Sequence, residues 1–145
     1  MTTQKKLEVQ DTQKATENNQ LYDYPRRDLQ DIQVYLERVL EIIELESFDT
    51  AVCSAVFIAE AVMRSFAEHH SIDFESKTPK ELAHTFHEQS LMSQEDYQIL
   101  TKAIDIRDAV MHKGEKIAID SGFARRVVEV VQHLFSQLSL ALFNK

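Results

Sequence analysis

Apolar residues recur at spacings of three and four along most of the chain after residue 25, which is the period of a helix that buries one face. Only two glycines and two prolines are present, so long helices are favoured over sheets joined by tight turns. The pattern predicts helices over residues 28–46, 50–69 and 79–89, a fourth from Ser93 to Gly114, and a fifth from Asp120 or Ser121 onwards. We therefore expect an all-α fold, an up-and-down bundle of four main helices plus one short helix.

Polar residues at the expected helix starts support these boundaries. The run Thr78-Pro79-Lys80-Glu81 combines an N-cap, a proline at the first helical position and a glutamate at the third, which is a strong start signal. Ser93 followed by Asp96 resembles the same arrangement. Asp49 is a candidate N-cap for the helix over residues 50–69.

The helix over residues 50–69 is apolar on almost every side, so we expect it at the centre of the fold. Two charged residues interrupt it, Glu60 and Arg64, and their spacing of four lets them pair. Two interpretations stay open: a purely structural ion pair, or a pair of which one member lines a functional cleft. Cys53, the single cysteine, lies in the same apolar pattern and is expected to be a small core residue.

The first 25 residues are polar and lack a sustained period, so we expect a flexible polar tail over 1–25, followed by one helical domain over 26–145. Leu21, Tyr22 and Tyr24 are the tail's candidates for docking. A single cysteine excludes a disulfide within the chain, and the start Met-Thr-Thr-Gln-Lys-Lys lacks the apolar segment of a secretory signal. With no run of about 18 apolar residues, these features favour a cytoplasmic protein without a membrane partner.

The last predicted helix carries two apolar stripes, so it needs more than one neighbour. The first stripe consists of Val127, Val130, Val131, Leu134, Leu138 and Ala141, and the second of Val128, Phe135 and Leu142. An exposed stripe would be a liability in a monomer. We therefore expect a homodimer that brings together the fourth and fifth helices of each chain.

The stretch from Ile104 to Gly114 has the apolar pattern of a helix, but it carries polar residues at positions on the apolar side of that helix. At about 100° per residue, one arc collects Leu100, Ala103, Ile104, Val110 and Met111. Arg107 falls near the middle of this arc, and an arginine is almost never buried unless it is paired. We expect it to meet an anion, a carboxylate or a wet cleft. Asp108 and His112 lie four apart on the flank of the arc, and Gly114 is expected to end the helix.

The net charge of −8 argues against a general nucleic-acid coat protein, whose affinity would rest on many phosphate contacts. The charges are unevenly distributed: residues 28–100 hold 4 basic and 15 acidic side chains, whereas residues 101–126 hold 6 basic and 4 acidic ones. The second segment is therefore locally +2 (6 − 4), which favours a small anion-binding cleft. The alternative, that these lysines and arginines are ordinary solvated charges, stays open.

The run Arg107-Asp108-Ala109-Val110-Met111-His112 resembles the R-x(4-6)-H motif of the HEPN superfamily, in which a polar residue usually follows the arginine and a glycine often follows the histidine. The resemblance implies a HEPN-like helical bundle that acts as a metal-independent endoribonuclease of the toxin or defence kind. It implies RNA as substrate, no cofactor, and a cleft between two protomers to which the arginine and histidine of both contribute. Family members often work beside an antitoxin or a minimal nucleotidyltransferase. Asp108 stands where asparagine is commoner.

The chemistry of the motif fits metal-free RNA cleavage. A histidine such as His112 can act as base or acid, while the planar fork of Arg107 suits phosphate oxygens. Asp108 would orient His112 or hold the helix end, with Glu60 and Arg64 as supporting residues. We expect no metal, because His84 and His87 lack a second carboxylate or histidine partner at helical spacing, although Glu88 is adjacent. The alternative is a non-catalytic dimerisation or regulatory module that binds a protein partner, in which Arg107 organises an interface.

Overall fold

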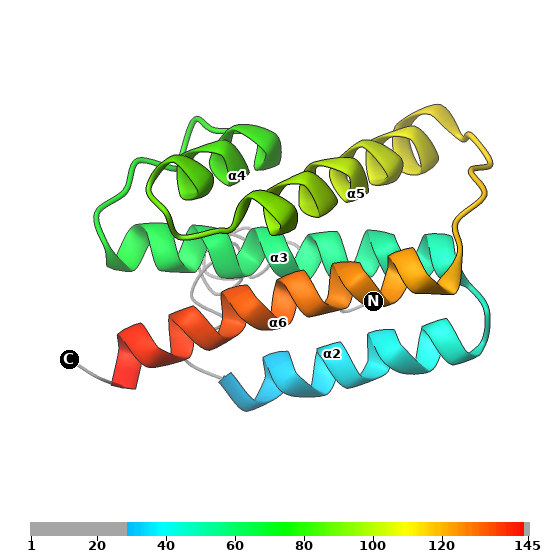
Figure 1. The fold of residues 1–145 in the computed structure, drawn as a ribbon, viewed down its shortest axis with the longest axis horizontal. Coiled ribbons are helices and arrows are strands. Elements are labelled where there is room, and N and C mark those ends of the chain that lie inside the picture. The colour runs from blue at the N-terminus through cyan, green and yellow to red at the C-terminus, as the bar shows by residue number, and fades with distance from the viewer. Residues whose placement is uncertain (1–28, 144–145) are drawn as a thin grey trace, which may run out of the picture.

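The computed structural model describes residues 29–143 and folds them into five helices, with no strand in that range (Figure 1). The helices are α2 (Leu29–Glu44), α3 (Phe48–His69), α4 (Pro79–Glu88), α5 (Gln94–Lys113) and α6 (Ser121–Phe143). The all-α prediction is confirmed, and each expected helix is present within a few residues of its expected bounds. The expected tail over residues 1–25 lies outside the described residues.

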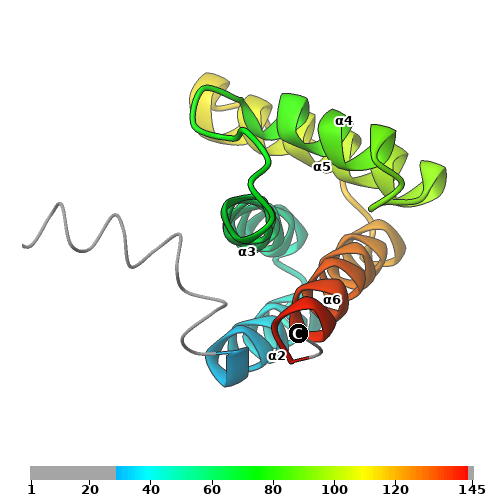
Figure 2. The ribbon, with the colours of Figure 1, turned by 90° about the vertical axis from the view of Figure 1, so that its left-hand side faces the viewer.

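α3 is the central helix, as its apolar composition predicts. It contacts each of the other four helices, and Figure 2 shows it between the α4 and α5 pair and the α2 and α6 pair. Within residues 29–143 it is the one helix long and apolar enough to cross a membrane, but 72% of that apolar window is buried inside the fold. The core helix of a globular domain passes the same test, so its composition is explained by its central position.

The helix ends follow the polar signals in the sequence, with one exception. Thr78 and Glu81 form the complete capping box at the start of α4, and the Ser93 side chain accepts a hydrogen bond from the Asp96 backbone at the start of α5. The expected N-cap role of Asp49 is wrong. α3 begins at Phe48, so Asp49 lies inside its first turn, where its carboxylate accepts from the Thr50 backbone N–H. An acidic residue is favourable there because it faces the positive end of the helix dipole.

Both apolar stripes of α6 find neighbours within the chain. Val127, Val131 and Leu138 are fully buried, Val128 of the second stripe is buried as well, and Phe135 is half-buried. α6 contacts α2, α3 and α5, which supplies the several neighbours that the two stripes require. The side chains of Ala141 and Leu142 lie outside the described residues. A homodimer through α5 and α6 stays a prediction, but the two stripes no longer require it.

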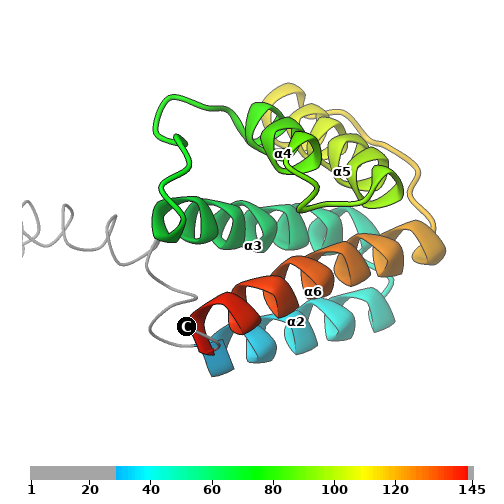
Figure 3. The ribbon, with the colours of Figure 1, turned by 60° about the vertical axis from the view of Figure 1, so that its left-hand side comes forward.

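One side of α3 is left open. α2 and α5 do not contact one another, and Figure 3 shows them on opposite sides of α3. The α4 helix packs on α5 rather than over this opening. The flank of α3 between α2 and the C-terminal half of α5 is therefore not covered by another described helix.

Candidate functional site

Arg107 lies in the C-terminal half of α5, on the side that faces α3, and its guanidinium is held by two carboxylates. Its Nε and Nη2 donate to Oδ1 of Asp108 at 3.2 and 3.0 Å. Its Nη1 donates to Oε1 of Glu60 on α3 at 3.5 Å. The side chain is 19% exposed. The expectation that Arg107 meets an anion is confirmed, and the anions are carboxylates of this same chain.

Glu60 connects Arg107 to a buried arginine on its own helix. Its other oxygen, Oε2, accepts a hydrogen bond from Nε of Arg64 at 3.0 Å. Arg64 is 8% exposed, and its Nη1 and Nη2 each donate at 2.9 Å to a backbone carbonyl, those of Phe74 and Lys77. Arg64 thereby fixes the loop between α3 and α4. The predicted Glu60–Arg64 pair is confirmed, and it is both structural and in contact with the motif arginine.

The four side chains form a row of alternating charges: Arg64, Glu60, Arg107 and Asp108. Each positive group faces a negative one, so the row carries no net charge. Arg107 is therefore well oriented but already neutralised by carboxylates.

His112 lies one residue before the end of α5 and is exposed to solvent. Gly114 follows with φ of 64°, a left-handed conformation that ends the helix as the sequence predicts. Among the described hydrogen bonds and ion pairs, none joins His112 to Asp108 or to Arg107. The Asp108 carboxylate is bound to Arg107 in this structure, so its expected role, to orient His112 or to hold the helix end, stays a prediction.

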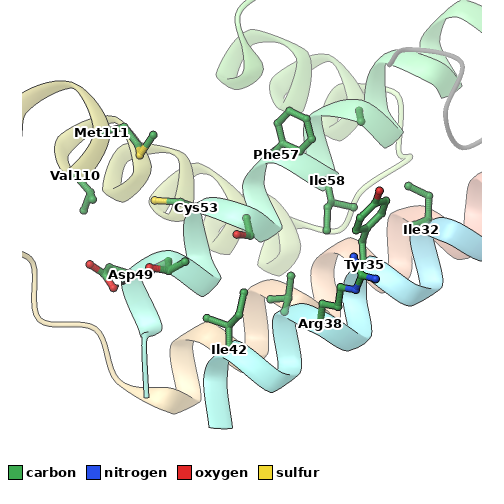
Figure 4. Close-up of a pocket in the computed structure, with 14 residues that line it drawn as sticks. Ile32, Tyr35, Arg38, Ile42, Asp49, Cys53, Phe57, Ile58, Val110 and Met111 are labelled. Atoms are coloured by element: carbon green, nitrogen blue, oxygen red, sulfur yellow. Dashed lines mark hydrogen bonds between the residues drawn. The ribbon is translucent and has the colours of Figure 1, made fainter. Parts of the chain in front are cut away.

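An apolar groove of about 700 Å³ lies on the open flank of α3 (Figure 4). Its walls and floor come from three helices: α2 supplies Tyr35, α3 supplies Cys53 and Phe57, and α5 supplies Val110 and Met111. Phe57 is 52% exposed and Met111 66%. The predicted inward position of Met111 is therefore wrong, because the helical period places Met111 on a side of α5 where α2 does not reach.

Cys53 also lies in this groove and is half-buried, which corrects its expected place in the core. Burial raises the pKa of its thiol above the ordinary value; Asp49 adds to the rise and Arg107 opposes it. A raised pKa means less thiolate at neutral pH, so Cys53 is not an activated nucleophile.

The groove contains only two charged lining residues, Arg38 from α2 and Asp49 from α3. Their charges have opposite sign, so the lining is neutral in a chain whose net charge is −8. Sequence reasoning missed this groove. Helical periodicity identifies the apolar side of each helix, but it does not show which sides remain uncovered once the helices pack.

The two histidines of α4 are engaged in contacts with other side chains, and a second groove is bordered by ion pairs. His84 pairs with Glu88 at 3.0 Å, and His87 stacks on the Tyr97 ring. No group of three or more His, Cys, Asp or Glu side chains in residues 29–143 is arranged to hold a metal. A smaller groove of about 470 Å³ between α5 and α6 is bordered by the pairs His133–Asp96 and Arg126–Glu95.

Comparison of the chain with models of protein families, with curated proteins and with solved structures found no match. The site combines an oriented arginine at Arg107, an exposed histidine at His112, and an apolar groove that none of the described helices covers.

Proposed function

We propose that this protein is a metal-independent endoribonuclease of the HEPN kind, which cuts RNA in a cleft formed by two copies of the chain. One observation carries the proposal. Val110 and Met111, which separate Arg107 from His112 in the sequence, form a wall of the uncovered apolar groove. A molecule that covers the groove therefore contacts the stretch of α5 that carries Arg107 and His112, although neither of these two side chains lines the groove. The alternation of direction among α2, α3, α5 and α6 in Figure 1 also supports a HEPN-like up-and-down bundle.

We infer that the groove is covered by a second copy of the chain. A two-fold interface brings the same patch of each copy together, so that patch must be complementary to itself. The groove meets this condition in its charges, because Arg38 and Asp49, the charged residues among its described lining, have opposite sign. It is also neutral in an otherwise acidic chain, so two copies meet there with the least repulsion. Exposed Phe57 and Met111 supply the apolar area that association needs.

In such a dimer each copy contributes one histidine and one arginine. One His112 takes the proton of the ribose 2′-OH while the 2′ oxygen attacks phosphorus. The bond from phosphorus to the 5′ oxygen breaks, and the other copy's His112 gives a proton to that leaving oxygen. Arg107 binds the non-bridging phosphate oxygens and stabilises their growing negative charge. The products are a 2′,3′-cyclic phosphate end and a 5′-hydroxyl end.

A second candidate is a non-catalytic dimerisation or regulatory module that binds a protein partner such as an antitoxin or a nucleotidyltransferase. The observation in its favour is the pairing of Arg107 with Glu60 and Asp108, which gives the arginine a structural role without RNA. In this alternative Arg107 holds the C-terminal half of α5 against α3, and the protein partner binds in the same groove.

The decisive experiment incubates the purified full chain with end-labelled RNA in EDTA and analyses the ends of the products. The proposal expects 2′,3′-cyclic phosphate ends, and expects His112→Ala and Arg107→Ala to abolish them. His84→Ala is the matched control, since His84 is also exposed but lies on α4 away from the groove. Absence of cleavage in the parent protein, or cleavage that survives in His112→Ala, refutes the nuclease.

Sedimentation of the same proteins tests the dimer separately. The chain has a mass of 16.8 kDa, so the proposal expects twice that mass for the parent and the single mass for Phe57→Glu. Leu45→Glu is the control, because Leu45 is an exposed leucine that does not line the groove. Arg38→Asp and Asp49→Arg variants should each dimerise poorly alone and associate when mixed. A parent protein that sediments as a monomer at tens of micromolar refutes this docking.

A further inference from the structure

The two carboxylates on Arg107 occupy different edges of its guanidinium. Asp108 takes the edge formed by Nε and Nη2, since both donate to its Oδ1. Glu60 takes the opposite nitrogen, Nη1. The Nε and Nη2 edge presents two parallel N–H groups, which is the geometry that binds carboxylate or phosphate oxygens most specifically. Asp108 therefore sits where a phosphate would bind.

The two carboxylates are also held to different degrees. Glu60 is 26% exposed and is anchored by Arg64, which is itself fixed to the carbonyls of Phe74 and Lys77. Asp108 is 44% exposed, and its described hydrogen bonds all come from Arg107. Lys80 adds only a longer-range attraction. Rotation about one side-chain bond would return the Asp108 carboxylate to water, whereas Glu60 would have to leave a buried arginine.

We propose that Asp108 is a displaceable carboxylate that occupies the phosphate-binding edge of Arg107 in the resting protein, and that an RNA phosphate binds by exchange with it. This inference rests on the proposed function, and in it the Asp108 carboxylate regulates the access of RNA to the proposed cleavage site. Glu60 keeps Arg107 in position during the exchange, because its contacts lie on the other side of the guanidinium. Asp108 is thus an autoinhibitory residue that leaves the site, and not a catalytic one.

The exchange keeps the charge of the site balanced, since one anion replaces another. A phosphate that entered while Asp108 remained would meet two carboxylates around one arginine, and like charges at that distance repel. The contact between Arg107 and Asp108 is only partly exposed, so it belongs in the upper part of the range measured for surface ion pairs, at about 0.4–1 kcal/mol. Removing the Asp108 charge should therefore tighten phosphate binding by about two- to fivefold.

The test is a titration of the full chain with inorganic phosphate, monitored by NMR in protein that carries ¹⁵N-labelled arginine. The signal observed is the Nε–H resonance of Arg107, which is assigned by its loss in Arg107→Lys. The variant is Asp108→Asn, which keeps the shape of the side chain and removes its charge. Asp105→Asn is the matched control: Asp105 lies one turn earlier on α5, is exposed, and pairs with Lys80 rather than with Arg107. Both variants change the net charge of the protein equally.

The proposal expects the Arg107 resonance of Asp108→Asn to shift already without phosphate, and its phosphate midpoint to fall two- to fivefold below that of Asp105→Asn. Equal midpoints in the two variants overturn the proposal. So does a failure of both to bind phosphate at Arg107. Because this readout needs no RNA and no cleavage, it is independent of the EDTA cleavage assay. An inactive parent with the expected phosphate shift rejects the nuclease, whereas an active parent with equal midpoints rejects the exchange.

Discussion

Replacing Arg64 should destabilise the fold far more than replacing the motif arginine, Arg107, although both contact Glu60. Arg64→Ala leaves the Glu60 carboxylate with only the 3.5 Å hydrogen bond from Arg107. It also removes the two hydrogen bonds of 2.9 Å that Arg64 donates to the carbonyls of Phe74 and Lys77. Breaking a buried pair in this way costs about 3–5 kcal/mol. Arg107→Ala leaves Glu60 paired with Arg64 and lets the exposed Asp108 carboxylate return to water, so it should cost about 1 kcal/mol.

Thermal melting followed by circular dichroism measures the difference. In a domain of this size each kcal/mol shifts Tm by about 4 °C. We therefore expect Tm to fall by about 12–20 °C in Arg64→Ala and by about 4 °C in Arg107→Ala. Lys116→Ala, at an exposed lysine of the loop after α5 that does not line the groove, controls for the loss of a positive charge. Equal losses of Tm in Arg64→Ala and Arg107→Ala would show that Glu60 depends on both arginines, and would contradict the anchoring role given to Arg64.

Three further predictions use other features of the chain. Gly114→Ala should cost about 1–2 kcal/mol in urea unfolding, because φ of 64° strains any residue with a Cβ, even though no atom lies within 4 Å of the added carbon. Hydrogen bonds from the Thr78 backbone and then its side chain lower the pKa of Glu81 from 4.5. Its contribution to stability is therefore present above pH 4.5 and lost as the pH falls through the lowered value, so parent and Glu81→Gln should converge in unfolding free energy in acid. Cys53 should react slowly with a maleimide at pH 7, and more slowly still as protein concentration rises and a second copy covers the groove; a rate independent of concentration would count against that coverage.

Much of the fold follows from short-range signals in the sequence. The start of α4 is specified within four residues, since Thr78, Pro79 and Glu81 satisfy or remove the free backbone donors of the first turn. The central position of α3 follows from its apolar composition, because most of its sides need a neighbouring helix to cover them. The Glu60–Arg64 pair follows from a spacing that places both on one face of the same helix.

The errors arise where the answer depends on a distant helix. Met111 and Cys53 have the period of core residues, yet both face a groove, because α2 and α5 do not meet across α3. Asp108 lies four residues from His112, but the guanidinium of its immediate neighbour competes for the carboxylate and is better placed. Whether the Asp108 carboxylate binds Arg107 or His112 depends on where Glu60 holds the guanidinium of Arg107. Glu60 and Arg107 are 47 residues apart, so no local sequence pattern predicts this contact.

The bonds of Arg64 have a consequence for the order in which the chain folds. Its carbonyl partners lie 10 and 13 residues further along the chain, and Glu60 lies four residues before it, whereas Arg107 reaches Glu60 from 47 residues away. Contacts that close short loops cost less chain entropy and form earlier. The contacts within residues 60–77 are therefore expected to form before α5 packs, so that Arg107 reaches a carboxylate that Arg64 already holds in place.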